Sequence, residues 1–294
     1  TWGCGQTHTG TVPDGVFTKG STNPVMFDTS VKVLAVGLAE CGQIPVKAAC
    51  NWLDGMVGVR VSEGTVRSWI TDLAAGLDEW DTHVVELLRQ ATVVGADETP
   101  IKVEGHKNAY AHVAVTDRLT RFHYGGRAKK DIIAGGVLEN HKGVLVCDGL
   151  SSYRNIGISS FQACMAHLLR ELRFATETFT PHNPDTPHPY PQIQHLHDLF
   201  TNTIHVTNET ARDGTDPPGP DKWVEQITDL CTSLLTALET VPVAKPVTDT
   251  KALTRRINRY LADGSLLAFT TDHTIPATNN TAEQAVRPLK VRQR

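Results

Sequence analysis

The sequence predicts a mixed α/β protein with a central sheet and flanking helices. Two apolar runs have the composition of buried strands, and each leads to an aspartate: residues 93–97 end at Asp97, and residues 143–147 precede Asp148. Neighbouring strands of this kind would hold the two carboxylates side by side, where they repel each other unless a cation lies between them. We therefore expect a metal site here. The alternative is that each aspartate only forms a turn, which suits Asp148 because glycine follows it.

Composition and charge indicate an ordinary globular protein. The length of 294 residues fits about two domains. Hydrophobic residues make up 40% and charged residues 20%, and the net charge of −4 gives no overall basic character. The six cysteines lack paired spacing, which favours reduced thiols over a disulfide scaffold. No apolar run reaches the roughly 18 residues of a membrane span, and no signal peptide is visible.

The ends of the chain have the features of a longer protein that has been cut. Residues 1–28 are rich in Gly, Thr and Pro without periodicity, and we expect an irregular segment. Cys4 and His8 could be the remnant of a zinc knuckle, although two ligands do not close a zinc site. The chain starts without Met and stops in mid-pattern after Lys290. We expect a chain that is cut at both ends to be impaired in the full activity of the longer protein.

Residues 29–90 are predicted to be helical. A helix starting near Thr29 is followed by one that Pro45 opens, which Gly55 and Gly58 are expected to break. Ser62 then caps a third helix. Helix, glycine turn and capped helix form a helix-turn-helix pattern, in which Arg67 would face DNA. The alternative is a small helical bundle without a DNA contact. A further helix at 78–90 leads into the first strand.

Residues 91–180 predict the first part of a ribonuclease H-like core. The strand at 93–97 is followed by apolar segments at 109–115 and 121–124, which are expected to form an antiparallel meander. A helix at 129–138, a strand at 143–147, a short strand at 161–164 and a helix at 165–178 complete the segment. Three antiparallel strands, a helix and a further strand that ends in an acid match the opening of that fold.

Residues 181–270 are predicted to form a helical insert. Proline-rich stretches at its start and at 214–220 are incompatible with helix and indicate loops. Helical periodicity covers 193–209, 221–239 and 248–261.

Residues 271–294 contain the third acidic candidate, Glu283, on a helix that Asn280 can cap. In one interpretation Glu283 only completes a capping box; in the other it is a third metal carboxylate. Arg287 and Lys290 lie on the same helical face as Glu283 if the helix continues through Pro288, and they suit a phosphate backbone. Residues 251–294 hold eight Lys/Arg against three Asp/Glu. This local excess of positive charge is the best electrostatic indication of a nucleic-acid partner.

Cys164 and His167 have the spacing of a zinc half-site, but the sequence shows no further ligands for them. We therefore predict a structural role for both, with a buried thiol and a hydrogen-bonded imidazole near the start of the insert. Arg170, on the helix that follows, would contact phosphate or lie in solvent.

Taken together, the motifs resemble the insertion sequence 66 family of bacterial transposases over about residues 30–294. The motifs are Asp97-Glu-Thr-Pro, Val-Cys-Asp148-Gly-x-x-x-Tyr, Cys164-x-x-His-x-x-Arg-Glu-Leu, Asn279-Asn-x-Ala-Glu-x-x-x-Arg-Pro and, upstream, Val61-Ser-Glu-Gly-Thr. The resemblance implies a DDE transposase with a ribonuclease H-like core, whose catalytic carboxylates fall on Asp97, Asp148 and Glu283. The cysteine-rich zinc segment of the family is reduced here to Cys4 and His8, and the family continues beyond the Glu helix.

Three carboxylates of this kind imply two Mg²⁺ or Mn²⁺ ions, because hard oxygen ligands disfavour Zn²⁺. Glu98 should face away from Asp97 and is not counted as a ligand. The resemblance implies transposon-end and target DNA as partners, a homo-oligomer on paired ends, no membrane, and a place in the bacterial cytoplasm at the nucleoid. Two other functions stay open: a transposase relic that only binds DNA, and a metal-dependent nuclease without strand transfer.

Overall fold

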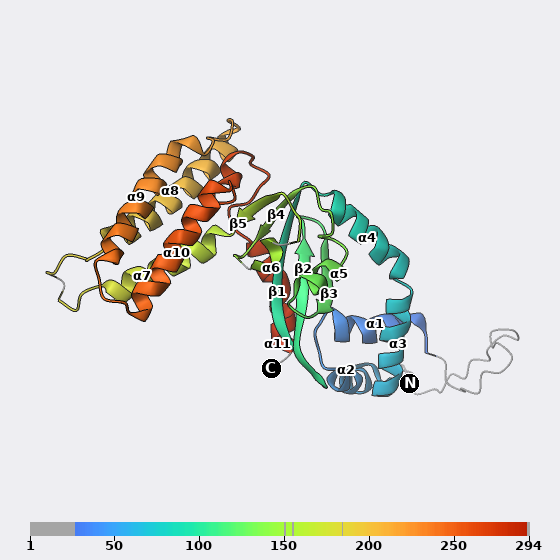
Figure 1. Ribbon diagram of the computed structural model, residues 1–294. Coiled ribbons are helices and arrows are strands. Elements are labelled where there is room, and N and C mark those ends of the chain that lie inside the picture. Colours follow the sequence, from blue (N-terminus) through green and yellow to red (C-terminus); the bar gives the residue numbers. More distant parts are fainter. Residues whose placement is uncertain (1–26, 150, 155, 184, 293–294) are drawn as a thin grey trace, which may run out of the picture. The chain divides into compact units, whose positions relative to one another are not determined.

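A computed structural model describes residues 27–149, 151–154, 156–183 and 185–292 (Figure 1). The chain divides into two compact units, one up to Leu77 and one from Asp78 onwards. The predicted zinc remnant at Cys4 and His8 lies outside the described residues.

Between residues 27 and 77, the described part of the first unit, lie three helices and one π-helical turn: α1 (Thr29–Glu40), α2 (Val46–Trp52), η1 (Leu53–Val57) and α3 (Glu63–Ala75). Ser62 caps α3 as the sequence predicts, because its Oγ accepts a hydrogen bond of 3.0 Å from the backbone N–H of Thr65. The core of this unit includes the buried residues Ala35, Leu53 and Val66. These helices enclose an apolar core of their own.

One prediction for this unit is wrong. Gly55 does not break the second helix, because the chain continues through it as a π-helical turn. The helical path ends at Gly58, whose φ of 70° is a left-handed conformation that glycine adopts without strain.

The second unit is built on a five-stranded mixed sheet in the order β3-β2-β1-β4-β5. Its strands are β1 (Val93–Val103), β2 (His106–Val115), β3 (Thr120–Gly125), β4 (Val144–Cys147) and β5 (Ser160–Ala163). The first three strands form the predicted antiparallel meander. β1 does not end at Asp97 as its apolar run predicts, because it stays paired with β2 as far as Val103. β4 pairs with β1 in parallel, and β5 pairs with β4 in parallel. The chain therefore returns to the middle of the sheet at β4, directly beside β1.

Helices cover both faces of this sheet. One face packs on α4 (Asp78–Gln90) and α5 (Lys129–Ala134) through a core that includes Val94, Ala96 and Leu145. The short helix α6 (Ser151–Arg154) adds Tyr153 to the same core. The helix predicted at 129–138 is shorter than expected, because Gly136, with a φ of 80°, follows its end.

The opposite face packs on α11 (Asn280–Arg292) and on a helical bundle. The bundle consists of α7 (Met165–Phe179), α8 (Pro191–Asp213), α9 (Asp221–Glu239) and α10 (Lys245–Ala262), and the short 3₁₀ turn η2 (Ala268–Thr270) follows it. Its core contains the fully buried side chains of Trp223, Phe200 and Tyr260. The three insert helices are confirmed, each within a few residues of its predicted bounds. Pro191 begins α8 at the first helical position, where proline needs no hydrogen-bond partner.

Candidate active site

The register of two parallel strands brings Asp97 and Asp148 to neighbouring positions. Gly95 is paired with Val146, and Ala96 with Cys147. Asp97 and Asp148 each come one residue after this last pair. Because side chains alternate along a strand, Asp97 belongs to the face of the sheet that carries Gly95 and Val146. Asp148 lies directly after the end of β4.

Helix α11 packs against that face. Ala282 and Val286, one helical turn apart, form an apolar cluster with Val113 and Val115 of β2. Val113 is the registered partner of Asp97, so the cluster lies directly beside the aspartate. Glu283 follows Ala282 and is thereby brought to the same region of the sheet.

Gly95 lets α11 begin close to the sheet. A Cβ atom at this position would lie 2.9 Å from Oδ1 of Asn279 and 3.0 Å from a methyl group of Val115. The Asn279 side chain donates a hydrogen bond of 2.7 Å to the carbonyl oxygen of Ala96. The start of α11 is therefore tied to the residue that precedes Asp97.

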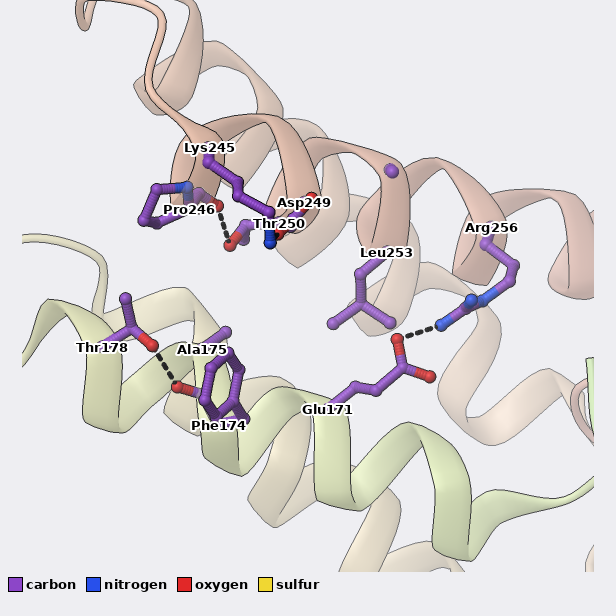
Figure 2. A pocket seen from close by; sticks show the side chains of 11 residues that line it. Glu171, Phe174, Ala175, Thr178, Lys245, Pro246, Asp249, Thr250, Leu253 and Arg256 are labelled. Atoms are coloured by element: carbon purple, nitrogen blue, oxygen red, sulfur yellow. Dashed lines mark hydrogen bonds and ion pairs between the residues drawn. The ribbon is translucent and has the colours of Figure 1, made fainter.

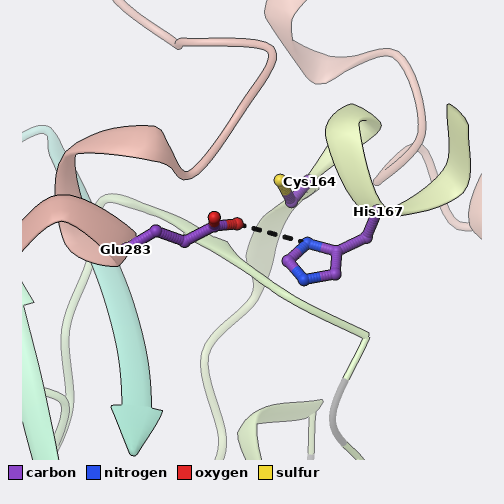
Figure 3. A group of neighbouring side chains, drawn as sticks. All are labelled: Cys164, His167 and Glu283. Carbon is purple, nitrogen blue, oxygen red and sulfur yellow. Dashed lines mark ion pairs between the residues drawn. The ribbon is translucent and has the colours of Figure 1, made fainter. Parts of the chain in front are cut away.

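The start of this helix differs by one residue from the predicted start. Asn280 is the first helical residue rather than the cap, and the backbone N–H of Glu283 donates to the carbonyl oxygen of Asn279. The helix also continues through Pro288 to Arg292. The Glu283 side chain therefore extends toward His167 of α7 instead of folding back on its own helix (Figure 3).

The pKa of Asp97 depends on its burial and on the charged groups near it. Burial raises the pKa of this carboxyl to about 6, against a hydrogen bond from the Glu98 backbone that lowers it. The negative charges of Asp148 and Glu283 both contribute to this raised pKa, as does that of Glu98. Nearby carboxylates destabilise the ionised form of a carboxyl group, and a bound cation would stabilise that form.

Glu98 is part of a separate polar cluster. Its side chain is only 3% exposed and pairs with Arg127, at 2.9 Å from Nη2 and 3.0 Å from Nε. Arg127 also lies over the ring of Tyr110, 5.5 Å from its centroid. The hydrogen bond to Glu98 raises the pKa of Arg127, and the charges of Glu98 and, more weakly, Asp148 add to this effect. Arg127 thus neutralises Glu98 and lies within electrostatic reach of Asp148.

Sequence reasoning missed the partner of Cys164 and His167. Nδ1 of His167 lies 3.6 Å from Oε1 of Glu283, and the Cys164 thiol is the third member of the group (Figure 3). The neighbouring thiol raises the pKa of His167. The Cys-x-x-His spacing indicates the first two members of the group. Glu283 lies 116 residues beyond His167 in the sequence, and only the fold brings it close to them.

The four predicted DNA-contacting residues are exposed. Arg287 and Lys290 lie on α11, one and two turns beyond Glu283. Arg170 lies on α7, and its charge lowers the pKa of His167, so it is near the Cys164–His167–Glu283 group. Arg67 belongs to α3 of the first unit and forms an ion pair of 3.8 Å with Glu63.

A groove of about 440 Å³ lies between α7 and α10 in the bundle (Figure 2). Its walls combine Phe174, Leu253 and the ion pair between Glu171 and Arg256. None of the predicted catalytic residues lines it. The groove is therefore distinct from the carboxylate region.

A family model described as transposase IS66 family matches residues 29–294. The chain belongs to this family. The IS66 match covers nearly the whole sequence and extends over both units, so it confirms the resemblance that the motifs indicate. No curated protein and no solved structure matches the chain. In the part of the chain that the structure describes, no helix combines the length and apolarity needed to cross a bilayer.

Proposed function

We propose that this IS66 family member is a DDE transposase that cleaves insertion-sequence ends and joins them to target DNA. Asp97, Asp148 and Glu283 are its catalytic carboxylates. The observation that carries the proposal is the packing of α11 beside Asp97, which brings Glu283 to the part of the sheet where Asp97 and Asp148 follow the last registered pair of β1 and β4. The raised pKa of Asp97 supports it, since the charges of both other carboxylates add to the main effect of burial. Asp148 and Glu283 lie 51 and 186 positions beyond Asp97 in the sequence, and both affect the ionisation of the Asp97 carboxyl group.

The sheet topology supports a ribonuclease H-like core. An antiparallel meander is followed by two strands that add in parallel on the other side of β1. The first acid lies on the central strand and the second follows the adjacent one. The helix that carries the third acid packs on the same face.

The donor set fits hard divalent cations. Oε1 of Glu283 is buried and has no hydrogen-bond partner among the described residues, and Asp97 is destabilised as an anion. Both features fit a cation, and carboxylate oxygens select Mg²⁺ or Mn²⁺. When bound, two such ions supply an activated water or 3′-hydroxyl and a stabilised leaving oxygen.

The chain's own residues then have separate roles. The three carboxylates hold the ions and fix their position at the sheet. Arg127 keeps Glu98 neutralised, which limits the negative charge behind the site. Arg287, Lys290 and Arg170 contact the phosphate backbone, which positions the DNA without reading its sequence. Arg67 on the capped helix α3 contacts DNA separately, in the helix-turn-helix manner.

We infer that the substrates are transposon-end and target DNA, held by a homo-oligomer at the bacterial nucleoid in the cytoplasm. We divide the chain into five segments, which are residues 1–28, 29–90, 91–180, 181–270 and 271–294. The middle and last segments form the catalytic core, and the fourth is an insert that supports DNA.

Two assays separate this function from its alternatives. Nicking of a labelled transposon end is measured with Mg²⁺ and with a chelator, and target joining is measured with a precleaved end and a plasmid. A transposase performs both reactions. Nicking without joining indicates a nuclease, and DNA binding without either reaction indicates a relic.

A further inference from the structure

We propose that Cys164, His167 and Glu283 form a second, thiophilic metal site that takes Zn²⁺ or a similar borderline ion. The site shares Glu283 with the proposed catalytic carboxylates but uses a sulfur and a nitrogen donor that Mg²⁺ chemistry does not need. It goes beyond the proposed transposase function, because it would bind metal in the absence of DNA.

The geometry brings three different donors together. Sγ of Cys164, a ring nitrogen of His167 and a carboxylate oxygen of Glu283 all lie within 4.8 Å of one another (Figure 3). Tetrahedral coordination with bonds of about 2.0–2.3 Å requires donor separations of roughly 3.3–3.8 Å. The separation of 3.6 Å between His167 and Glu283 is already in that range.

Two of the donors are buried and face each other at 3.6 Å, which is the distance of a long ion pair rather than of a hydrogen bond. Nδ1 of His167 and Oε1 of Glu283 are both inaccessible to water and lack a hydrogen-bond partner of normal geometry among the described residues. Unsatisfied buried polar atoms are costly and rare in folded proteins. A metal ion between the two atoms would satisfy both at once.

The surrounding structure holds the thiol in place. Cys164 lies between the end of β5 and the start of α7, and its backbone N–H donates to the carbonyl oxygen of Cys147. Its Sγ accepts a hydrogen bond of 3.2 Å from the backbone N–H of Asn279. Such support of a ligand by neighbouring groups orients it for a metal. The ligands thus come from rigid elements: a strand–helix junction, the first turn of α7 and the first turn of α11.

The donor set selects the class of metal. A thiolate, an imidazole and a carboxylate suit Zn²⁺ and its spectroscopic substitute Co²⁺, whereas Mg²⁺ prefers oxygen ligands alone. Three protein ligands leave a fourth position for water or for a DNA oxygen. Because Glu283 is shared, an ion here also restrains the carboxylate that the catalytic site needs.

The test is a Co²⁺ titration of the whole chain after treatment with a chelator, followed by the thiolate-to-cobalt charge-transfer absorption. Affinity for Zn²⁺ is then measured by competition with a chromophoric chelator. We expect one Co²⁺ per chain with a thiolate band. Cys164→Ser should remove the band, and His167→Gln should weaken binding by at least about 100-fold.

Matched controls show whether the band comes from this site. Cys231→Ser, at a buried thiol of α9, and Cys4→Ser should both keep the band and the affinity. Circular dichroism monitors the folding of each variant. If Cys164→Ser misfolds, His167→Gln decides the question, because the His167 side chain is 32% exposed and its replacement disturbs the core less. The absence of a thiolate band in the parent, or unchanged affinity in His167→Gln, would overturn the proposal.

Failure of this proposal is distinguishable from failure of the transposase function. Asp97→Asn should abolish Mg²⁺-dependent nicking and leave Co²⁺ binding unchanged, because Asp97 is not one of the three donors. Loss of Co²⁺ binding with intact nicking would concern the second site only.

Discussion

Ala96 of β1 and Cys147 of β4 are the last registered pair between the two parallel strands. One residue further along comes an aspartate in each case: Asp97 lies on the face of β1 that packs against α11, and Asp148 directly follows the end of β4. This relationship, and the packing of α11 on that face, is the structural basis of the predictions below.

Replacing Asp97 by asparagine should reduce Mg²⁺-dependent nicking by at least about 100-fold, because the change removes one ligand charge while keeping the side-chain shape. DNA binding should stay the same or become slightly tighter, since a negative charge near phosphate is lost. Nicking and gel-shift assays measure the two effects. Asp117→Asn, at an exposed aspartate that forms an ion pair with its neighbour Arg118, is the matched control. Full nicking by Asp97→Asn would rule out the two-ion site.

The metal-free protein should lose stability as the pH rises. Asp97 has a pKa of about 6 in the folded protein against a reference value of 3.8, so the folded state favours the protonated form. Its contribution to the free energy of unfolding is therefore fully present below pH 3.8 and is lost as the pH passes through 6. After allowance for partial exposure, this loss is about 2 kcal/mol. Melting curves of the parent and Asp97→Asn at several pH values in chelator measure it, because asparagine does not titrate.

Added Mg²⁺ should reverse this trend. Protons and the cation compete for the same carboxylates, so Mg²⁺ should raise the melting temperature more at pH 8 than at pH 5. The same Mg²⁺ should have little effect on Asp97→Asn at either pH. A stabilisation by Mg²⁺ that is equal at both pH values would place the ion elsewhere.

Gly95→Ala should destabilise the second unit by about 1–3 kcal/mol, because the new methyl group meets Asn279 and Val115. The displaced α11 should also carry Glu283 away, so nicking should fall together with stability. Gly37→Ala adds the same methyl group in α1, where a Cβ has open space, and should be neutral or slightly stabilising. Equal melting temperatures for Gly95→Ala and the parent would show that α11 does not approach β1 this closely.

Arg287→Ala should weaken DNA binding and reduce the slope of log affinity against log salt by about 0.9, the value for one phosphate contact on duplex DNA. Fluorescence anisotropy over a salt series measures the slope. Arg118→Ala, at an exposed arginine of the β2–β3 connection, should leave it unchanged. If Arg287→Ala keeps the parental slope, this residue serves the fold rather than the DNA.

Local patterns were enough to predict most of the elements. The apolar runs gave four of the five strands to within three residues, and the cap at Ser62 gave the start of α3. The exception is β1, which continues six residues beyond its predicted end at Asp97. Errors arose where one residue type permits two outcomes: Gly55 is tolerated inside a π-helical turn, and Asn280 begins α11 instead of capping it.

Tertiary contacts were beyond the reach of the sequence pattern. The hydrogen bond from Asn279 to Ala96 joins residues 183 positions apart, and no periodicity encodes it. The same holds for the approach of Glu283 to His167, which turned an apparent half-site of two ligands into a group of three. The family match confirms the motif-based resemblance, while the roles of the individual carboxylates stay predictions.

The most direct measurement is a crystal structure of the chain bound to transposon-end DNA and Mn²⁺, with the ions located by anomalous scattering. The proposed function predicts manganese peaks within coordination distance of Asp97, Asp148 and Glu283. Anomalous peaks that none of these three carboxylates contacts, in crystals whose DNA occupies the α11 face, would contradict it.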